Sequence, residues 1–303
     1  MTSFCARIVK TVIRLYTFRY RRRQMSLSQN VALKPRPYKC PEGFTHGAQT
    51  FNGVKIEIIA PCGYCKDKII LHFHGGGARM DMESLFYRKV AQSYAVATGM
   101  PVYTVDYVAD VNKTHPSLLN ECYSAYKGLS ERFGPENIVA VGDSMGANLM
   151  LATCLKARDE ELSLPVGLVS VCGFLDHSAS GESYRRNSHR DPMYALPFYM
   201  NKDKHADKLR RVPPYAAGCD LKDPFLSPAF GRYDGFPPML IVCGADEVDE
   251  SDSAMLYEAA ERCGVTVEYK KYAGMFHDFL YIAPFMPESR NALKDICRFI
   301  TSF

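Results

Sequence analysis

Short apolar runs recur along this chain and alternate with stretches of helical periodicity. Val54–Ala60 alternates polar with apolar residues, as a half-exposed strand does, and precedes the unbroken runs Ile69–Phe73, Val102–Val105, Ile138–Val141, Val166–Cys172 and Met239–Cys243. Unbroken runs of this kind suit strands buried on both faces of a parallel sheet. The helical stretches are Glu83–Thr98, Ser117–Phe133, Met145–Arg158, Asp252–Cys263 and Pro287–Ile300. The alternation predicts an α/β fold with a mostly parallel central sheet and helices on both faces.

The composition is that of an ordinary globular chain. Its 303 residues are 47% hydrophobic and 23% charged, which is enough apolar material to bury a substantial core. No long polar linker divides the chain, so we expect one body. Residues from about 174 to 225 interrupt the alternation, because they are rich in Ser, Arg, Asp, His, Pro and Tyr and contain no clean buried strand. Such an insertion predicts a lid or cap over the site.

Positive charge is concentrated at the N-terminus. The chain has 37 Lys and Arg and 33 Asp and Glu, and residues 1–23 hold seven of the basic residues and no acid. The remaining chain therefore has 30 basic against 33 acidic residues, a net charge of −3. We expect no basic face for nucleic acid beyond the terminal cluster.

Within residues 1–23, apolar residues at helical spacing precede an Arg-rich run; they are Ile8, Val9, Val12, Ile13, Leu15 and Tyr16. We favour a helix that packs on the body and has a solvated basic end. The alternative is a basic amphipathic helix in peripheral contact with a membrane surface. The segment is too short and too charged to span a bilayer. Because charges interrupt the apolar run and no small-residue cleavage site follows, we expect no secretory signal.

Cysteine usage favours a cytoplasmic location. The chain has eleven cysteines, and Cys154, Cys172, Cys243 and Cys297 fall where buried strands or helices are expected. Buried cysteine behaves as a small hydrophobe, and reduced thiols are the rule in the cytoplasm. The pair Cys62-Gly-Tyr-Cys65 has the spacing of a zinc or redox site, but no second pair or matching histidine accompanies it. We interpret it as a hairpin turn and expect neither a metal nor a cofactor.

The segment Gly142-Asp-Ser144-Met-Gly146 is the strongest chemical signal. It follows the apolar run Ile138–Val141 and opens the helical stretch Met145–Arg158. This strand–turn–helix context is the one that a nucleophile elbow requires, in which small residues flank a serine held exposed at a tight turn. We therefore predict that Ser144 is a nucleophile.

A second signal, His74-Gly75-Gly76-Gly77, comes directly after the run Ile69–Phe73. Three glycines let the backbone approach a substrate closely and direct N–H groups at a developing negative oxygen. The N–H of Met145, which follows the nucleophile, would complete this oxyanion hole. A phosphate-binding glycine loop is the alternative, but it lacks the Lys-Ser or Lys-Thr and the glycine spacing that such loops use.

His277 is the best-placed base for Ser144. It lies in the loop Gly274–Phe279, between the strand-like Val265–Lys271 and the last helical stretch, and it comes after the serine and the acids in the chain. The run Met239–Cys243 ends in an acidic segment, and Asp246, Glu247 and Asp249 are candidates for the acid that orients His277.

Together the motifs resemble the hormone-sensitive-lipase-like branch of α/β-hydrolases, which includes the bacterial esterases and arylacetamide deacetylases. The matching segments are His74–Gly77, Gly142–Gly146 with Asn148-Leu149, Asp223–Pro228, Phe236–Pro238 and Gly274–Phe279, and Ser178–Met193 is similar to the start of the branch's cap. The resemblance runs from about residue 51 to the C-terminus. Departures are Tyr107–Asn112, where the branch has another motif, Met145 in place of a small residue, and Ala147 in place of a glycine.

The resemblance implies an α/β-hydrolase fold whose cap joins an N-terminal helical segment, residues 1–50, to the insertion at about 174–225, with residues 51–303 as the catalytic domain. It also implies that the acid is about thirty residues before the histidine, which points to Glu247. Asp246 and Asp249 fit if one residue has been inserted or lost.

The predicted function is a serine carboxylesterase that hydrolyses small, uncharged, short-acyl esters through Ser144, His277 and Glu247. One alternative is a lactone or amide hydrolase of the same fold. Another is a non-catalytic binder of small ligands, which the presence of His277 disfavours. The sequence does not indicate an oligomeric state.

Overall fold

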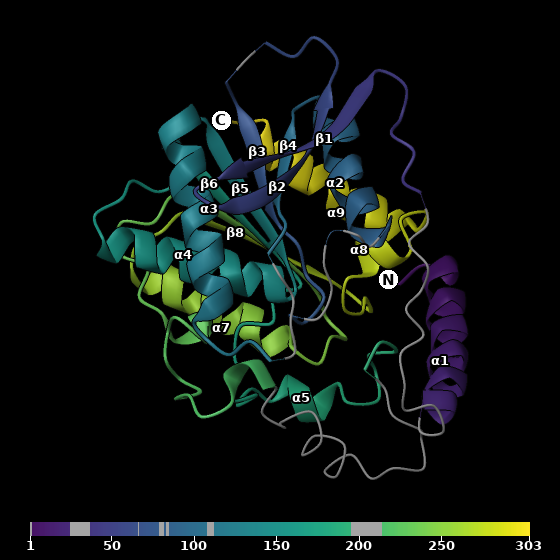
Figure 1. Ribbon diagram of the computed structural model, residues 1–303. Helices are drawn as coiled ribbons and strands as arrows, with labels where there is room; N and C mark the ends of the chain where they lie inside the picture. Colours follow the sequence, from purple (N-terminus) through teal and green to yellow (C-terminus); the bar gives the residue numbers. More distant parts are fainter. Residues whose placement is uncertain are drawn as a thin grey trace.

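The core of the computed structural model is one twisted sheet (Figure 1). The structure describes residues 2–24, 37–65, 67–78, 82, 85–107, 112–194 and 214–303, with side chains of the first helix described as far as Tyr16. The strands are β1 (Phe44–Phe51), β2 (Val54–Pro61), β3 (Ile69–Phe73), β4 (Val102–Val105), β5 (Ile138–Asp143), β6 (Gly167–Val171), β7 (Met239–Gly244) and β8 (Val267–Tyr272). They lie in the order β1-β2-β4-β3-β5-β6-β7-β8. From β4 to β8 all neighbours are parallel, whereas β2 is antiparallel to both β1 and β4.

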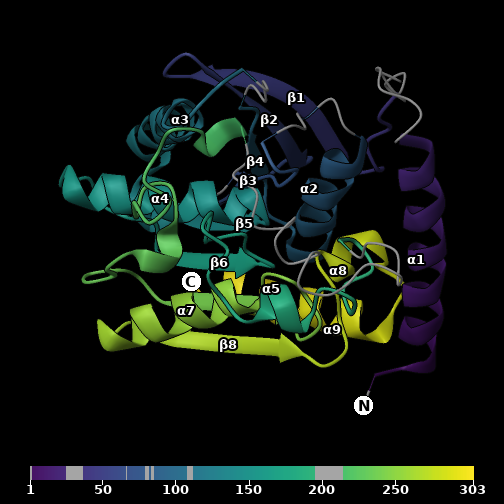
Figure 2. The same cartoon turned by 90° about the horizontal axis from the view of Figure 1, so that it is seen from below.

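Helices cover both faces of this sheet (Figure 2). The longer ones are α1 (Phe4–Gln24), α2 (Leu85–Thr98), α3 (Ser117–Phe133), α4 (Met145–Asp159), α7 (Glu250–Arg262) and α9 (Pro287–Ile300), and α5 (Ser183–Arg186) and α8 (Phe279–Ile282) are single turns. One core cluster joins the sheet to α3, α4 and α7, and the other joins it to α2, α8 and α9. The predicted layered α/β architecture is confirmed.

Successive side chains of a strand point to opposite faces of the sheet, so each central strand contributes to both core clusters. In β3, Leu71 faces the α3–α4–α7 layer and Ile70 faces the α2–α8–α9 layer. The same alternation divides Ala140 from Val141 in β5. Because both faces are apolar and covered, these strands read as unbroken apolar runs in the sequence.

Strand β1 is absent from the sequence prediction, and it begins within the segment assigned to the cap. Its side chains are mostly exposed and show no apolar alternation, so only the backbone ladder with β2 defines it. The signal that could have revealed it is the turn Asn52-Gly53, in which both residues have positive φ, at 46° and 81°. Asn-Gly is typical of a two-residue hairpin.

Some sequence predictions fall outside the described residues. These are residues 83–84 of one expected helix, 108–111 of the departure after β4, 195–213 of the insertion, and 25–36 of the N-terminal segment. Cys62 and Cys65 are exposed in the turn that follows β2. That turn is not the hairpin we predicted, because the next strand, β3, pairs with β4 and β5 instead of β2.

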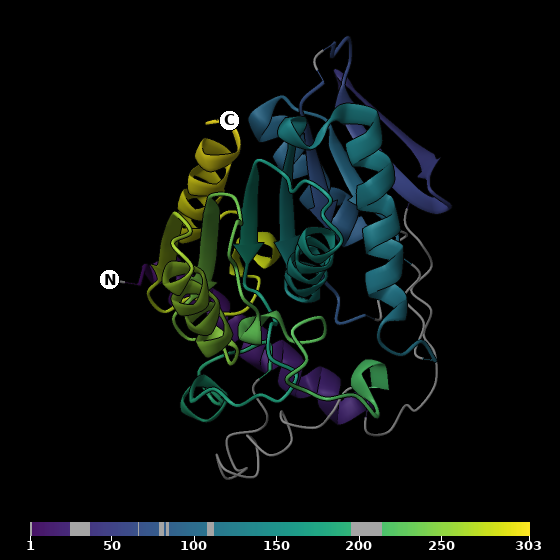
Figure 3. The same ribbon diagram turned by 90° about the vertical axis from the view of Figure 1, so that its left-hand side faces the viewer.

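Helix α1 packs on the body and is fastened to it at several points. The N–H and hydroxyl of Ser3 donate to the carboxylate of Glu288 at 2.7 and 2.9 Å. Farther along, Lys10 forms an ion pair with Asp246, and Arg14 donates to the carbonyl of His189 at 2.8 Å. Helices α1 and α5 both lie toward the carboxyl ends of the parallel strands (Figure 3).

Candidate active site

Ser144 occupies a strained turn between β5 and α4. Its φ is 51° and its ψ is −121°, a conformation that non-glycine residues rarely adopt. Its backbone N–H donates to the carbonyl of Val171 on the neighbouring strand β6 at 3.0 Å, and its own carbonyl accepts from Phe174 at 3.1 Å. Backbone hydrogen bonds to the end of β6 and to the segment after it thus hold this tight turn, as a nucleophile elbow requires.

The two glycines of the elbow are required by close backbone approach. A Cβ on Gly146 would lie 2.0 Å from the carbonyl oxygen of Phe73, and a Cβ on Gly142 would lie 2.6 Å from the carbonyl oxygen of Gly146. Both separations are far shorter than a van der Waals contact, so a side chain at either position would displace the backbone. The start of α4 therefore packs directly against the end of β3.

His277 reaches Ser144 from the loop between β8 and α8. Its Nε2 lies 2.9 Å from the Ser144 hydroxyl, although the two residues are 133 positions apart in the chain. Both side chains are buried. The structure thus brings together the two residues that the sequence predicts as nucleophile and base.

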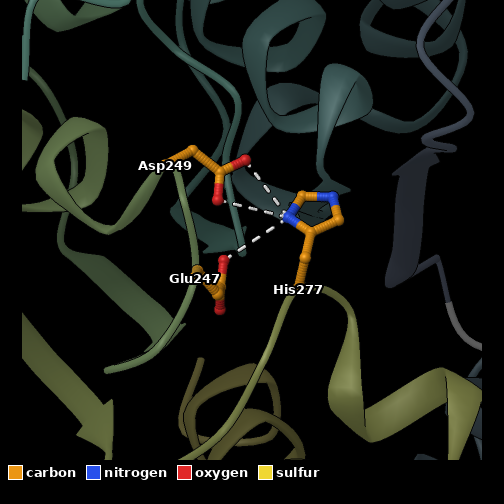
Figure 4. Close-up of side chains that lie close together, drawn as sticks. All are labelled: Glu247, Asp249 and His277. Atoms are coloured by element: carbon orange, nitrogen blue, oxygen red, sulfur yellow. Dashed lines mark hydrogen bonds and ion pairs between the residues drawn. The ribbon is translucent and has the colours of Figure 1, made fainter. Parts of the chain in front are cut away.

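Two carboxylates face the other nitrogen of the imidazole (Figure 4). Nδ1 of His277 lies 3.1 and 3.3 Å from the two oxygens of Asp249, and 3.4 Å from Oε2 of Glu247. Glu247 also accepts a hydrogen bond from the N–H of Gly244. The third candidate, Asp246, forms an ion pair with Lys10.

The imidazole and its acids perturb one another's pKa values. Burial alone lowers the pKa of His277, but the charges of Asp249 and Asp278 raise it, and it lies well above the ordinary value of 6.5. Burial raises the pKa of Asp249 to about 6 and that of Glu247 above its usual range, although His277 counteracts both shifts. Such mutual perturbation of buried titratable groups is typical of catalytic sites.

The same three side chains, Glu247, Asp249 and His277, also lie close enough together to be considered as cation ligands. The geometry argues against that use. Because carboxylates only accept hydrogen bonds, the ring proton of a neutral His277 belongs on Nδ1, and Nε2 accepts from the Ser144 hydroxyl. A metal ion at Nδ1 would displace that proton and leave Nε2 protonated and unable to accept from Ser144, so metal binding and the role of a base exclude each other.

Asp191, within the insertion at about 174–225, is a site residue that the sequence did not reveal. Its Oδ2 accepts hydrogen bonds from the backbone N–H groups of His277 and Val248, both at 3.3 Å, and its Oδ1 accepts from that of Met193 at 2.9 Å. Asp191 is fully buried. It therefore fixes the histidine loop and the acid loop to this insertion. In the sequence it stood out only as part of Ser178–Met193, the segment similar to the start of the family's cap.

The glycine loop leaves β3 beside the elbow, because Phe73 pairs with Gly142. Gly76 and Gly77 have positive φ, at 98° and 61°, which favours glycine. The hydroxyl of Tyr107 donates to the carbonyls of His74 at 2.7 Å and Gly75 at 3.0 Å, and its ring stacks on the His74 imidazole. Tyr107, which the sequence analysis noted only as the start of a departure from the family pattern, thus holds the carbonyls of this loop.

Comparison with known proteins agrees with this architecture. Residues 70–281 match a family model described as the alpha/beta hydrolase fold. An esterase of Acinetobacter venetianus is 31% identical over 238 residues, which cover 78% of this chain and 75% of that protein. The chain belongs to the α/β-hydrolase fold family.

Two further similarities place this α/β-hydrolase more finely. An acetyl-hydrolase of Streptomyces hygroscopicus is 28% identical over 228 residues, which cover 75% of this chain and 73% of that protein. The crystal structure of a hormone-sensitive lipase from a metagenome library superimposes with a TM-score of 0.83 and 26% identity, covering 100% of this chain and 99% of the other. The predicted family, the hormone-sensitive-lipase-like branch, is confirmed.

Substitution of Gly146 tests the close approach between α4 and β3. We expect Gly146→Ala to lower the free energy of unfolding by about 3 kcal/mol and to displace Ser144, because the added Cβ meets the Phe73 carbonyl. Gly47→Ala is the matched control, since no heavy atom lies within 4 Å of the added Cβ, and we expect a change within about 0.5 kcal/mol. Urea unfolding measures both, and equal stability of the two variants would contradict the packing described.

Proposed function

We propose that this α/β-hydrolase is a serine carboxylesterase that hydrolyses small, uncharged, short-acyl esters. The observation that carries the proposal is the 2.9 Å contact between the Ser144 hydroxyl and His277 Nε2, with carboxylates on the opposite side of the same imidazole. A serine hydroxyl is a weak nucleophile until an adjacent base removes its proton. The names of two relatives, an esterase and an acetyl-hydrolase, support the substrate class.

The reaction proceeds in two halves. His277 takes the proton of Ser144 while Oγ attacks the ester carbonyl, and the imidazolium then protonates the leaving alcohol as the C–O bond breaks. Water next enters, gives a proton to His277 and attacks the acyl-enzyme, and Ser144 leaves with that proton. The carboxylates at Nδ1 stabilise the imidazolium that forms in each half.

The negative oxygen that develops on the substrate requires hydrogen-bond donors. We assign this role to the backbone amides of Gly75, Gly76 and Gly77 together with that of Met145. The first amides of a helix have no acceptor within the helix, which leaves the Met145 N–H available at the N-terminus of α4. One such donor typically contributes about 3 kcal/mol to lowering the barrier.

Glu247 is the acid to which the family resemblance points, and we propose that Asp249 shares its role. Asp249 is the nearer of the two to Nδ1, and Glu247 is anchored by the Gly244 N–H at the end of β7. Either carboxylate alone can hold the ring in the correct tautomer. We further propose that α1 and the insertion at about 174–225 form the cap that limits the size of the acyl group, with Met145 narrowing the pocket.

A series of p-nitrophenyl esters from acetate to palmitate tests the function. We expect hydrolysis of acetate and butyrate and little hydrolysis of palmitate, because the cap restricts the acyl pocket. Ser144→Ala should lower kcat by about four orders of magnitude or more. Undiminished turnover by Ser144→Ala would refute the mechanism, and a preference for palmitate would refute the proposed substrate class.

The shared-acid proposal is tested with Glu247→Gln, Asp249→Asn and the double variant. We expect each single variant to retain much more kcat than the double variant, because one carboxylate still faces Nδ1. The double variant should lose about 10⁴-fold, as when the sole triad acid is removed. If one single variant is as impaired as the double variant, that residue alone is the acid.

The pH dependence follows from the raised pKa of His277. Only the neutral imidazole can accept the Ser144 proton, so kcat/KM falls as the pH drops through this pKa, and we expect the acidic limb of the profile to lie above pH 6.5. Asp249→Asn removes the main charge that raises this pKa and should move the limb to lower pH. A limb that stays in place in this variant would contradict the coupling between the two groups.

A further inference from the structure

Helix α1 has two different apolar faces. The inner face, with Ala6 buried and Cys5, Val9 and Ile13 partly buried, packs on the cluster that includes α8 and α9. The outer face carries large apolar side chains that remain exposed: Phe4 (76%), Ile8 (49%), Val12 (58%) and Leu15 (62%). Their spacing of four, four and three residues places them in one stripe along the helix. Of the apolar residues expected to pack on the body, Val9 and Ile13 do so, whereas Ile8, Val12 and Leu15 face the solvent.

Apolar residues at the end of α8 and after it add to this exposed apolar surface. Phe285, which follows α8, is 60% exposed. Between α1 and the end of α8 lies a groove of about 400 Å³, lined by Ile8, Val12, Ile282, Phe285 and other apolar residues. Figure 2 shows α1 as the outermost helix on this side, beside α8 and α9. A contiguous exposed apolar surface of this kind marks an interaction site.

The charged side chains of the N-terminal segment are all positive. Residues 1–23 contain seven Lys and Arg and no acid, although the remaining chain carries an excess of acids. Lys10 is neutralised by Asp246, but Arg7 is exposed, and the sequence adds Arg19, Arg21, Arg22 and Arg23 along the same helix.

We propose that the outer face of α1, together with Phe285, docks on the surface of an anionic phospholipid membrane. The helix lies parallel to the surface, with the apolar stripe inserted among the acyl chains, and the positive charge of residues 1–23 attracts it to the lipid phosphates. Apolar side chains and cationic groups on one helix are the combination that binds such interfaces. In the described part of the chain no helix is long and apolar enough to cross a bilayer, which agrees with surface binding.

A second copy of the chain fits this face less well. A symmetric dimer through the stripe would bring two α1 helices together, each with an excess of positive charge and no acid on the helix to offset it. The membrane occupant is favoured because it supplies the negative charge. Docking also needs no unfolding, since Ser3 and Arg14 fasten α1 to the body through contacts away from the stripe.

Sedimentation with vesicles tests the proposal on the full chain. We expect binding to vesicles that contain phosphatidylserine, no binding to vesicles of phosphatidylcholine alone, and weaker binding as salt is added. Failure to bind phosphatidylserine vesicles at low salt would overturn the proposal. Binding that is equal for both lipids would also overturn it, because the cationic helix would then have no role.

Substitutions on and off the apolar stripe test which part of the surface binds the vesicles. Val12→Gln with Leu15→Gln removes apolar area but retains good helix formers, and we expect vesicle affinity to fall at least about tenfold. Val96→Gln, at a residue of α2 that is 52% exposed, is the matched control and should bind like the wild type. Arg21→Gln, Arg22→Gln and Arg23→Gln together should weaken binding about a hundredfold.

Two further measurements distinguish a loss of membrane binding from misfolding and from a change of oligomeric state. Far-UV circular dichroism should be unchanged in the Val12/Leu15 variant, because both side chains are exposed and make no part of the core. Light scattering reports the oligomeric state in solution. A wild-type dimer that the Val12/Leu15 variant converts to a monomer would assign the stripe to a second copy and overturn the membrane proposal.

Discussion

The contact between the start of α4 and the end of β3 is the constraint on which the site depends. It is possible only because Gly146 has no side chain to meet the Phe73 carbonyl. It brings the tight turn at Ser144 beside the glycine loop that leaves β3, so that nucleophile and proposed oxyanion donors come from adjacent strands. The strained φ of Ser144 is maintained by hydrogen bonds to Val171 at the end of the neighbouring strand β6 and to Phe174 after it.

A second constraint is the density of buried acids around His277. Besides Glu247 and Asp249, burial raises the pKa of Asp278 to about 8 and that of Asp143 to about 7, partly offset by the charge of His277. One imidazole faces several carboxylates, and they cannot all be ionised in so small a volume. The protonation of the ring is therefore linked to that of the whole cluster and not to that of a single acid.

The sequence predicted those features that depend on local pattern. The buried strands and the elbow at Ser144 are contiguous segments whose residue types reflect their own environment, and His277 was recognised by its place in the chain order. Strand β1 was missed because an exposed strand has no apolar periodicity to detect. Asp191 and the proximity of Asp249 to His277 arise from loops that meet only after folding, so no spacing within one segment reveals them.

The ion pair between Lys10 and Asp246 links the N-terminal helix α1 to the loop after β7. Asp246 precedes Glu247, so the loop that presents the proposed acids is braced from outside by the N-terminal helix. Removing α1 would leave the mostly buried carboxylate of Asp246 without Lys10. It would also expose the apolar residues that pack against Ala6. A fusion or a deletion in the first turns of α1 would therefore disturb the support of the loop that carries the proposed acids.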